Sequence, residues 1–205
     1  MAGTVGTGSN FMAAVRERRT IYGISKESSV ADERIVELIE EAVKHTPSAF
    51  NSQSARVVVL FGEHHNKLWD LTKEVLKGMV SADQFASTEQ KLNGFRNGHG
   101  TVLFFEDMTV IEGLQSSFPT YKEHFPDWSM QSNGMLQFVI WTALESEGLG
   151  ANLQHYNPLI NDKVKDEWSI PGSWKLLAQM PYGNPTAQAG DKEFKPLSER
   201  MKVFK

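Results

Sequence analysis

The sequence predicts one domain in which helices and strands are mixed. Three short apolar runs favour buried strands, at Val57–Phe61, Thr101–Phe105 and Trp174–Met180. Between them lie stretches with apolar residues three and four positions apart, the spacing of a helix that buries one face. No internal repeat and no strong linker interrupts the 205 residues, a length that suits one domain with a sizeable core.

Composition narrows the possible function classes. Hydrophobic residues make up 40% of the chain and charged residues 22%, as in ordinary soluble proteins, and the net charge of −4 argues against general nucleic-acid binding. The chain has no cysteine, which excludes disulfides, thiolate zinc sites and cysteine nucleophiles. No apolar run reaches the ~18 residues of a membrane span, and the N-terminus has no apolar signal core. We therefore expect a cytoplasmic protein with neither nucleic acid nor membrane as a partner.

The chain begins with a Gly/Thr-rich segment, residues 1–8, that we expect to be disordered. Ser9 or Asn10 can cap a first helix, and R-R-T-I-Y at Arg18–Tyr22 then leaves it. The rigid fork of arginine suits phosphate, because it offers two parallel hydrogen bonds. By itself, however, this basic cluster favours a solvated helix end, where cations complement the helix dipole.

A second helix is predicted to follow Ser29–Asp32, which we interpret as a variant of the capping box. It ends before Pro47, and a small, polar stretch, T-P-S-A-F-N-S-Q-S-A-R at Thr46–Arg56, leads into the first strand. Its amides and hydroxyls both donate and accept hydrogen bonds. Two interpretations are open for this stretch: a well-capped loop, or a polar wall for a flat, heteroatom-rich ligand.

The middle of the chain gives weaker patterns. A helix is predicted over 64–79, and we interpret its His64-His65 pair as a surface helix start, because adjacent residues point to different helix faces. Residues 81–95 give a weak helix. The irregular, aromatic-rich stretch 107–128 is either a lid over a site or an ordinary surface excursion.

The longest helical pattern, Met130–Glu147, is apolar nearly all round, so we expect it to be buried centrally or at a subunit interface. Gly148–Tyr156 then runs extended, and Asn157-Pro158 opens another helix. The last clear strand should stop at Pro181. A tail with basic residues follows, and its end, Met201–Lys205, is β-like.

Four segments in this order resemble the nitroreductase family of FMN-dependent oxidoreductases. Their spacing matches the family, and the similarity covers nearly everything from about Ser9 onward. The run Q-S-N-G-M-L-Q-F-V-I-W-T-A-L-E with the glycine-containing segment after it is especially similar to the branch of fungal fatty-acid-repression-type nitroreductases and their bacterial relatives. The four segments are R-R-T-I-Y at Arg18–Tyr22, P-S-A-F-N-S-Q at Pro47–Gln53, G-L-G-A-N-L-Q-H-Y-N-P at Gly148–Pro158, and K-E-F-K-P-L at Lys192–Leu197.

The resemblance implies an α+β, three-layer fold with a central, mostly antiparallel sheet flanked by helices. Residues 1–205 would form a single FMN-binding domain. It also implies an intertwined homodimer in which the C-terminal segment is exchanged onto the partner, with a flavin at each subunit interface. The long apolar helix and the β-like end of the chain suit such an arrangement.

The resemblance also supplies candidate cofactor-binding residues. Arg18, Arg19 and Thr20 would bind the FMN phosphate and the nearby flavin edge. Tyr22 stands where many members carry a basic residue. The loop residues would come from the other subunit, and the glycine-containing segment would lie along the isoalloxazine with a backbone N–H facing its N5. The two lysines would complete the phosphate clamp. These residues are Arg18, Arg19, Thr20, Tyr22, Ser48, Asn51, Gln53, Gln154, His155, Tyr156, Lys192 and Lys195.

The function implied is transfer of a hydride from NAD(P)H through FMN to nitroaromatic or quinone-like acceptors, by a ping-pong mechanism. No catalytic protein residue and no metal are expected, because the cofactor does the difficult chemistry. Phe118, Tyr121 and Phe125 could shape the acceptor face or simply pack a lid. Two alternatives are a flavin-binding regulatory or storage protein with little turnover, and the family's reductive dehalogenation or flavin fragmentation, for which no extra lid motif is present.

Overall fold

The computed structural model describes residues 8–79 and 81–205. The expectation of a disordered start falls on residues 1–7, which lie outside the described residues, and on Gly8, which begins the first helix. The helices are α1 (Gly8–Glu17), α2 (Asp32–His45), α3 (Gly62–Lys77), α4 (Ala82–Arg96), α5 (Met108–Ser117), α6 (Phe125–Ser146) and α7 (Asn161–Trp168). The strands are β1 (Ile24–Ser25), β2 (Ala55–Phe61), β3 (Gly100–Asp107), β4 (Gly150–Ala151) and β5 (Trp174–Pro185). Three short 3-10 turns are η1 (Ala49–Asn51), η2 (Pro119–His124) and η3 (Leu197–Glu199).

The sheet is antiparallel at every pairing in the described chain. Its order is β1-β5-β3-β2, and the short β4 also pairs with β5. β5 is longer than predicted because Pro181 does not stop it. The proline lacks an N–H, but its carbonyl still accepts a hydrogen bond from the N–H of Asn152 (3.2 Å), so the strand continues to Pro185.

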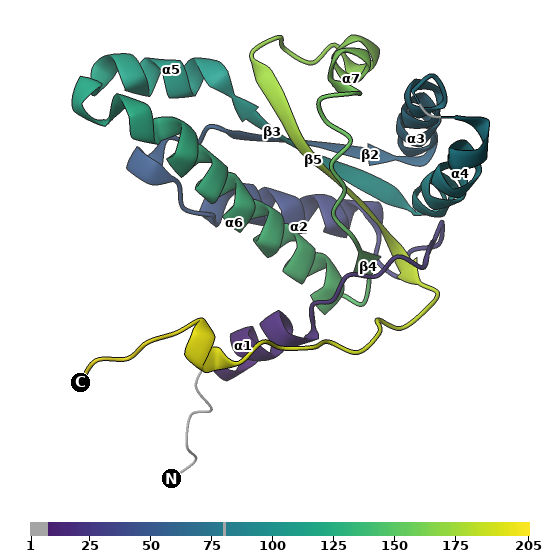
Figure 1. The fold of residues 1–205 in the computed structure, drawn as a ribbon, viewed down its shortest axis with the longest axis horizontal. Coiled ribbons are helices and arrows are strands. Elements are labelled where there is room, and N and C mark those ends of the chain that lie inside the picture. The colour runs from purple at the N-terminus through teal and green to yellow at the C-terminus, as the bar shows by residue number, and fades with distance from the viewer. Residues whose placement is uncertain (1–7, 80) are drawn as a thin grey trace.

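Helices cover both faces of the sheet, which gives three layers (Figure 1). Side chains alternate along β3: Val102 and Phe104 join a core with α2 and α6, whereas Leu103 and Phe105 join a second core with α3, α4 and α7. This arrangement confirms the predicted α+β fold with helices on either side of an antiparallel sheet. The long α6 crosses one face, and both of its ends contact predicted ligand-binding segments.

The stretch 107–128, predicted to be irregular, is largely helical. Asp107 caps α5 by accepting a hydrogen bond from the N–H of Thr109 (3.2 Å). Pro126 lies in the first turn of α6, where a missing N–H has no partner to lose. α6 therefore begins at Phe125, five residues before the predicted start, because the proline starts a helix instead of breaking one.

Three local predictions were wrong. Ala31 is the N-terminal cap of α2 and no side chain caps that end, so the proposed capping box does not form. His65 is buried instead of exposed: its ring lies between the hydroxyl of Thr101 (2.8 Å) and the carbonyl of Arg96 (3.2 Å). Burial lowers the pKa of His65 to about 4, so the ring is neutral at neutral pH. Leu159, an apolar residue of the helix predicted after Asn157-Pro158 and for that reason expected to face inward, is exposed.

Many large apolar side chains remain exposed in the single chain. On α6 these are Met130, Met135 and Val139. The C-terminal tail runs past α1 and away from the body of the molecule (Figure 1), and it exposes Phe194 and Phe204 among other apolar residues. The predicted β-like end, 201–205, forms no strand within this chain. Among the described residues, no helix is both long and apolar enough to cross a membrane.

Candidate functional site

Two of the four predicted segments lie side by side. The N–H of Ile21 donates to the carbonyl of Ala151 (2.9 Å), and the Asn152 side-chain amide donates to the carbonyl of Ile21 (2.9 Å). Asn152 is in turn held by the side-chain amide of Gln154, which donates to its Oδ1 (2.8 Å). The R-R-T-I-Y segment is thus bound to the glycine-containing segment through two hydrogen bonds, and a third, within the latter segment, orients Asn152.

A half-buried carboxylate fixes the arginine pair. Glu145, near the C-terminal end of α6, accepts the backbone N–H of Arg19 (2.6 Å) and the indole N–H of Trp141 (2.8 Å). The guanidinium carbon of Arg18 lies 4.4 Å from the centroid of the Trp141 ring, a cation–π contact. Burial raises the pKa of Glu145, and the donated N–H groups and the nearby charge of Arg18 offset part of that rise.

A small hollow, which we call the arginine hollow, opens beside these groups. It encloses about 170 Å³ between the end of α1, the end of α6, residues 148–150 and residues 185–188. Arg18 lines this hollow, and its Nη1 is buried without a hydrogen-bond partner among the described residues. An enclosed, unpaired guanidinium nitrogen is a suitable donor for a phosphate oxygen. Thr20 and Tyr22 are exposed and do not line this hollow.

The tail reaches the same end of the molecule but not with its lysines. The guanidinium of Arg19 donates to the carbonyl of Gly190, which fastens the start of the tail beside α1. Lys192 and Lys195 are exposed, and Nζ of Lys192 lies 5.5 Å from the centroid of the Phe194 ring. Within one chain, neither lysine lines the arginine hollow, so their place in a phosphate clamp stays a prediction.

The polar loop is held in a strained conformation. Phe50, Asn51 and Gln53 have positive φ angles of 57°, 49° and 48°, which non-glycine residues rarely adopt. The N–H of Gln53 donates to the hydroxyl of Ser48 (3.0 Å), and Nη1 of Arg56 donates to the carbonyl of Gln53 (2.6 Å). A ligand-binding loop commonly stores strain of this kind, since a plain connection would relax out of it.

A second hollow lies under this loop, and we call it the loop hollow. It encloses about 240 Å³, and Ser48, Gln53 and Ser132 contribute polar groups to its lining. The hydroxyl of Thr46 is buried there without a described partner. Asn51 does not line it and is exposed. Amide, hydroxyl and apolar groups together fit one edge of a flat, heteroatom-rich ring.

The two hollows lie at different places along α6. Ser132 lines the loop hollow and Glu145 lines the arginine hollow. From Ser132 to Glu145 the helix rises by about 20 Å, at ~1.5 Å per residue. One chain therefore does not bring the predicted loop residues to the predicted phosphate residues. This separation is compatible with a loop that serves the partner's site, which stays a prediction.

In the glycine-containing segment, the backbone N–H groups are the main hydrogen-bond donors to consider for a ligand. The N–H groups of Gln154 and Tyr156 are both taken by Gln179, through its carbonyl (2.7 Å) and its side-chain Oε1 (2.8 Å). The Tyr156 ring packs against Trp69, with centroids 6.0 Å apart. His155 is exposed, and its N–H donates to no described residue. Of the three predicted contacts, the His155 N–H is the donor left available.

The aromatic residues of 107–128 gather around a residue that the sequence did not single out. Phe50, at the tip of the polar loop, contacts four rings, with centroid distances of 5.0 to 6.0 Å. These rings are Phe118, Tyr121, Phe125 and Trp128. The loop and the α5–α6 region are thereby joined into one aromatic surface, which we call the Phe50 cluster.

A buried carboxyl group supports the loop from below. The side-chain amide of Asn133 donates to Glu106 (2.8 Å) and also to the carbonyl of Phe105 (3.1 Å). Glu106 is only 1% exposed, and burial raises its pKa, although bonds from Ser54 and Asn133 act in the opposite direction. This network joins β3, and through Ser54 the end of the loop, to the middle of α6.

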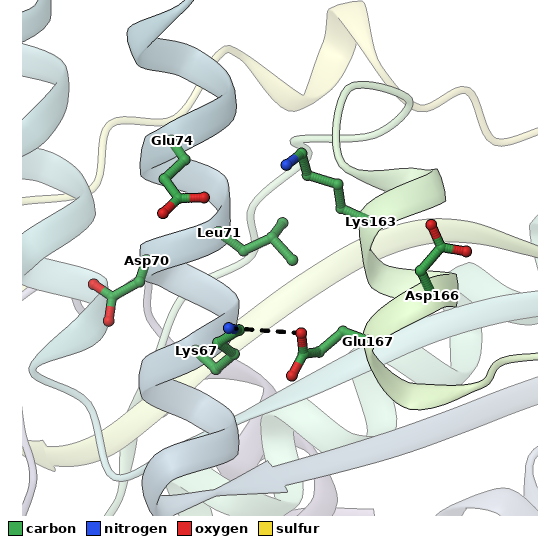
Figure 2. A pocket seen from close by; sticks show the side chains of 7 residues that line it. All are labelled: Lys67, Asp70, Leu71, Glu74, Lys163, Asp166 and Glu167. Atoms are coloured by element: carbon green, nitrogen blue, oxygen red, sulfur yellow. Dashed lines mark ion pairs between the residues drawn. The ribbon is translucent and has the colours of Figure 1, made fainter.

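The largest of the three hollows described here lies elsewhere, between α3 and α7 (Figure 2). It measures about 340 Å³, and an ion pair between Lys67 and Glu167 (3.7 Å) spans it. Asp70 at its edge is bound by Arg96 (2.8 Å). It holds no aromatic side chain and none of the predicted site residues, so we interpret it as a solvated groove. Within the described residues, no group of three or more His, Asp or Glu is arranged to hold a metal ion.

The site geometry can be set beside known proteins. Residues 15–184 match the model of the nitroreductase family. The chain belongs to the nitroreductase family. Membership and fold together support an oxidoreductase role, in agreement with the resemblance of the four segments.

Similar proteins cover nearly the whole chain. Nitroreductase FRM2 of Saccharomyces cerevisiae is 35% identical over 188 residues, which cover 90% of this chain and 93% of FRM2. Nitroreductase CinD of Lactococcus lactis, solved in complex with chloramphenicol, is 44% identical with a TM-score of 0.87, covering 95% of this chain and all of CinD. A Desulfovibrio desulfuricans protein solved in complex with FMN shares the fold, with a TM-score of 0.65 at 23% identity over 94% of this chain and 96% of that protein.

Sequence reasoning missed several residues that build this nitroreductase site. Glu145 and Trp141 stand four positions apart, a spacing that predicts contact on one helix face but not which N–H groups the carboxylate receives. Asn152 and Gln179 lie in apolar runs where a polar residue is unexpected, which was a usable signal. Phe50 gave no signal, since one phenylalanine in a loop is ordinary.

Proposed function

We propose that this nitroreductase is an FMN-dependent oxidoreductase. It would transfer a hydride from NAD(P)H through FMN to nitroaromatic or quinone-like acceptors, by a ping-pong mechanism. The observation that carries the proposal is the docking of R-R-T-I-Y on the glycine-containing segment. This docking leaves the enclosed Nη1 of Arg18 and the N–H of His155 without acceptors.

FMN, when bound, supplies the hydride-transfer chemistry, and the protein supplies binding and orientation. Arg18 would hold the phosphate in the arginine hollow. The N–H of His155 would donate toward the flavin N5. Ser48 and Gln53 of the partner subunit's loop would satisfy the polar edge of the ring. No protein nucleophile takes part, because each of these groups only binds or orients.

The nature of the acceptor is proposed from two observations. The Phe50 cluster exposes the faces of Phe50, Phe118 and Tyr121, which suits a flat aromatic molecule. CinD, 44% identical to this chain, was solved in complex with chloramphenicol and with 4-nitrophenol. Both molecules are small aromatic compounds, in keeping with an acceptor of the proposed kind.

We also propose a homodimer in the cytoplasm. The exposed apolar residues of α6 and of the tail would be covered by the partner, and the tail would be exchanged. A monomer would then hold FMN poorly, since its loop hollow and arginine hollow lie about 20 Å apart along α6. Analytical ultracentrifugation with detection at both protein and flavin wavelengths tests this proposal: flavin sedimenting with a monomer would contradict it.

The decisive experiment uses the purified protein with FMN. We expect yellow protein that NADH or NADPH bleaches rapidly without oxygen, and that a nitroaromatic acceptor or a quinone recolours. A slow bleach that no acceptor reverses would favour the alternative, a flavin-binding regulatory or storage protein. Protein that takes up no FMN would contradict both. Running both nicotinamides against an acceptor panel also identifies the preferred donor.

The phosphate assignment has its own test. Arg18→Ala removes a charge-assisted hydrogen bond in an enclosed site, so FMN affinity should fall roughly 10- to 100-fold. Arg16→Ala is the matched control, because Arg16 is an exposed arginine on the same helix end and does not line the hollow. Equal affinities of the two variants would remove Arg18 from the phosphate site.

A further inference from the structure

Gln179 is a fully buried polar residue with no role in the function proposed so far. It lies near the middle of β5, opposite Leu103 of β3, and its exposed fraction is 0%. On the other edge of β5, its backbone exchanges two hydrogen bonds with Gln154 (2.7 and 2.9 Å). A buried amide side chain is costly unless its polar atoms are paired. Its contacts therefore show what this residue stabilises.

The side chain of Gln179 binds the backbone just beyond this pair. Its Oε1 accepts the N–H of Tyr156 (2.8 Å), and its Nε2 lies 3.5 Å from Oδ1 of Asn157. The bridge to Gln154 is isolated and no backbone pairing follows it. At Tyr156, a side-chain oxygen therefore takes the place that a carbonyl of β5 would hold in a continuing ladder.

Because Oε1 of Gln179 replaces a β5 carbonyl at Tyr156, it determines the direction in which the neighbouring backbone N–H groups point. In an extended segment, successive N–H groups point to opposite edges. The N–H groups of Asn152, Gln154 and Tyr156 all bind β5, the last through Gln179. The N–H of His155, between the last two, must then point away from β5. Without the hydrogen bond to Gln179, no backbone hydrogen bond among the described residues would hold the N–H of Tyr156 toward β5.

We propose that Gln179 is a positioning residue for the flavin site: by binding both neighbours of His155, it directs the His155 N–H to the ligand. The inference rests on the proposed FMN function, since the ligand in question is the flavin. Gln179 itself touches no ligand in this arrangement. It acts through the peptide backbone of the glycine-containing segment.

Amide hydrogen exchange on the wild-type protein, resolved by NMR, tests the orientation directly. Without FMN, the Tyr156 amide should exchange slowly and the His155 amide quickly. With saturating FMN, the His155 amide should slow by at least about tenfold, the scale of one added hydrogen bond. FMN binding that leaves His155 exchange unchanged would overturn this inference and leave the proposed function standing. No FMN binding at all would overturn both.

Variants test whether Gln179 is the cause. Gln179→Met keeps the volume but removes the acceptor, so Tyr156 exchange should rise about tenfold without FMN, and the absorbance maxima and reduction potential of bound FMN should shift. Gln179→Glu keeps a side-chain oxygen and should restore protection of Tyr156. The control Thr72→Val removes another fully buried hydrogen bond, to Leu68 on α3, and should change neither readout.

Each outcome is informative about the inference. If Gln179→Met leaves Tyr156 protection and the flavin potential as in the wild type, Gln179 is not a positioning residue. If Thr72→Val produces the same changes as Gln179→Met, the effect is general loosening of the core and the inference fails. If Gln179→Met does not fold, the wild-type exchange pattern decides: without FMN, a Tyr156 amide that exchanges as quickly as the His155 amide overturns the inference, because its bond to Gln179 is then not formed.

Discussion

The two ends of α6 hold their neighbouring segments by different means. At the C-terminal end, Glu145 receives N–H groups from Arg19 and Trp141, and hydrogen bonds fix the arginine pair. At the N-terminal end, rings pack around Phe50, whose backbone has a positive φ, and the guanidinium of Arg56 donates a hydrogen bond to the loop carbonyl of Gln53. One end is polar and enclosed, and the other is aromatic and half exposed.

The difference indicates how much of the site a single chain completes. Hydrogen bonds are directional and saturable, so the polar end is defined by a few partners, all of which one chain provides. Aromatic packing without a cover leaves apolar faces exposed, as at Phe50 and Tyr121. We infer that the polar end is preformed, whereas the aromatic end gains its final shape from what binds against it.

The largest expected effect is at the polar end. Glu145→Ala leaves the Arg19 and Trp141 N–H groups without acceptors, so the free energy of unfolding should fall by roughly 3 kcal/mol, and FMN retention should fall with it. Denaturant titration measures the loss. The control Glu147→Ala removes an exposed ion pair with Arg34 on the same helix end and should change stability little. A similar, small loss in both variants would mean that the polar end is not preformed by Glu145.

The next effect concerns Arg56, at the aromatic end. Arg56 joins the carbonyl of Gln53 to the carboxylate of Asp107 (3.1 Å), and through Asp107 to the cap of α5. Arg56→Lys cannot keep both contacts, so unfolding free energy should drop by about 1–2 kcal/mol. Limited proteolysis should also show faster cleavage in the loop. An unchanged cleavage rate would show that the strained loop holds itself without Arg56.

A smaller effect separates backbone strain from ring packing. Phe50→Ala and Phe50→Gly both remove the ring from the cluster, but only glycine adopts a positive φ without strain. The glycine variant should therefore be more stable than the alanine variant by about 1 kcal/mol, the reverse of the usual preference. Thermal unfolding of the two variants provides the comparison. If alanine is the more stable, the left-handed conformation at Phe50 is not a feature of the folded loop.

The smallest effect is that Glu145 and Asp107 make the free energy of unfolding depend on pH with opposite signs. Burial raises the pKa of Glu145 above 4.5, so the folded chain holds this proton more tightly and stability falls as pH rises through the raised pKa. At Asp107, burial also acts to raise the pKa, but hydrogen bonds from Thr109 and Ser173 and the charge of Arg56 bring it below 3.8. Its contribution is present above 3.8 and is lost as pH falls through the lowered pKa.

Replacing each carboxyl group by its neutral amide should therefore remove one of these two opposite pH dependences of the unfolding free energy. Unfolding free energies of Glu145→Gln and Asp107→Asn, measured between pH 3 and 7 and compared with the wild type, test this. Relative to wild type, the first variant should gain stability as pH rises, and the second should lose its disadvantage as pH falls. Two slopes of the same sign would show that the two ends share one electrostatic environment.

The sequence predicted best those helices and strands whose formation is determined by the pattern of their own residues. The helices around Ile35 and Leu68 have a strong three-and-four spacing of apolar residues, the strands around Val58 and Leu103 are continuous apolar runs, and all four formed as predicted. Pro119 and Pro126 interrupt the helical pattern of 107–128 in the sequence, yet each lies in the first turn of a helix. A proline at the first turn of a helix is favourable, and the sequence alone does not show which turn it occupies.

The candidate site was predictable in its segments but not in its contacts. Resemblance located the four segments, and the structure placed the first beside the third. The roles of Glu145 and Gln179 depend on which backbone N–H groups meet a side chain across the fold, and no local pattern contains that information. Likewise, the strain at Phe50 and Gln53 comes from loop geometry that neither residue type predicts.

The proposed dimer, in which a partner covers the exposed tail, would make the behaviour of this protein depend on its concentration. If its apolar residues are covered only by a second chain, mass action couples folding, assembly and flavin retention. Dilution should then dissociate the dimer and release FMN. The midpoint of thermal unfolding should rise with protein concentration. Assays at nanomolar enzyme would underestimate specific activity relative to micromolar assays, for reasons unrelated to chemistry at the flavin.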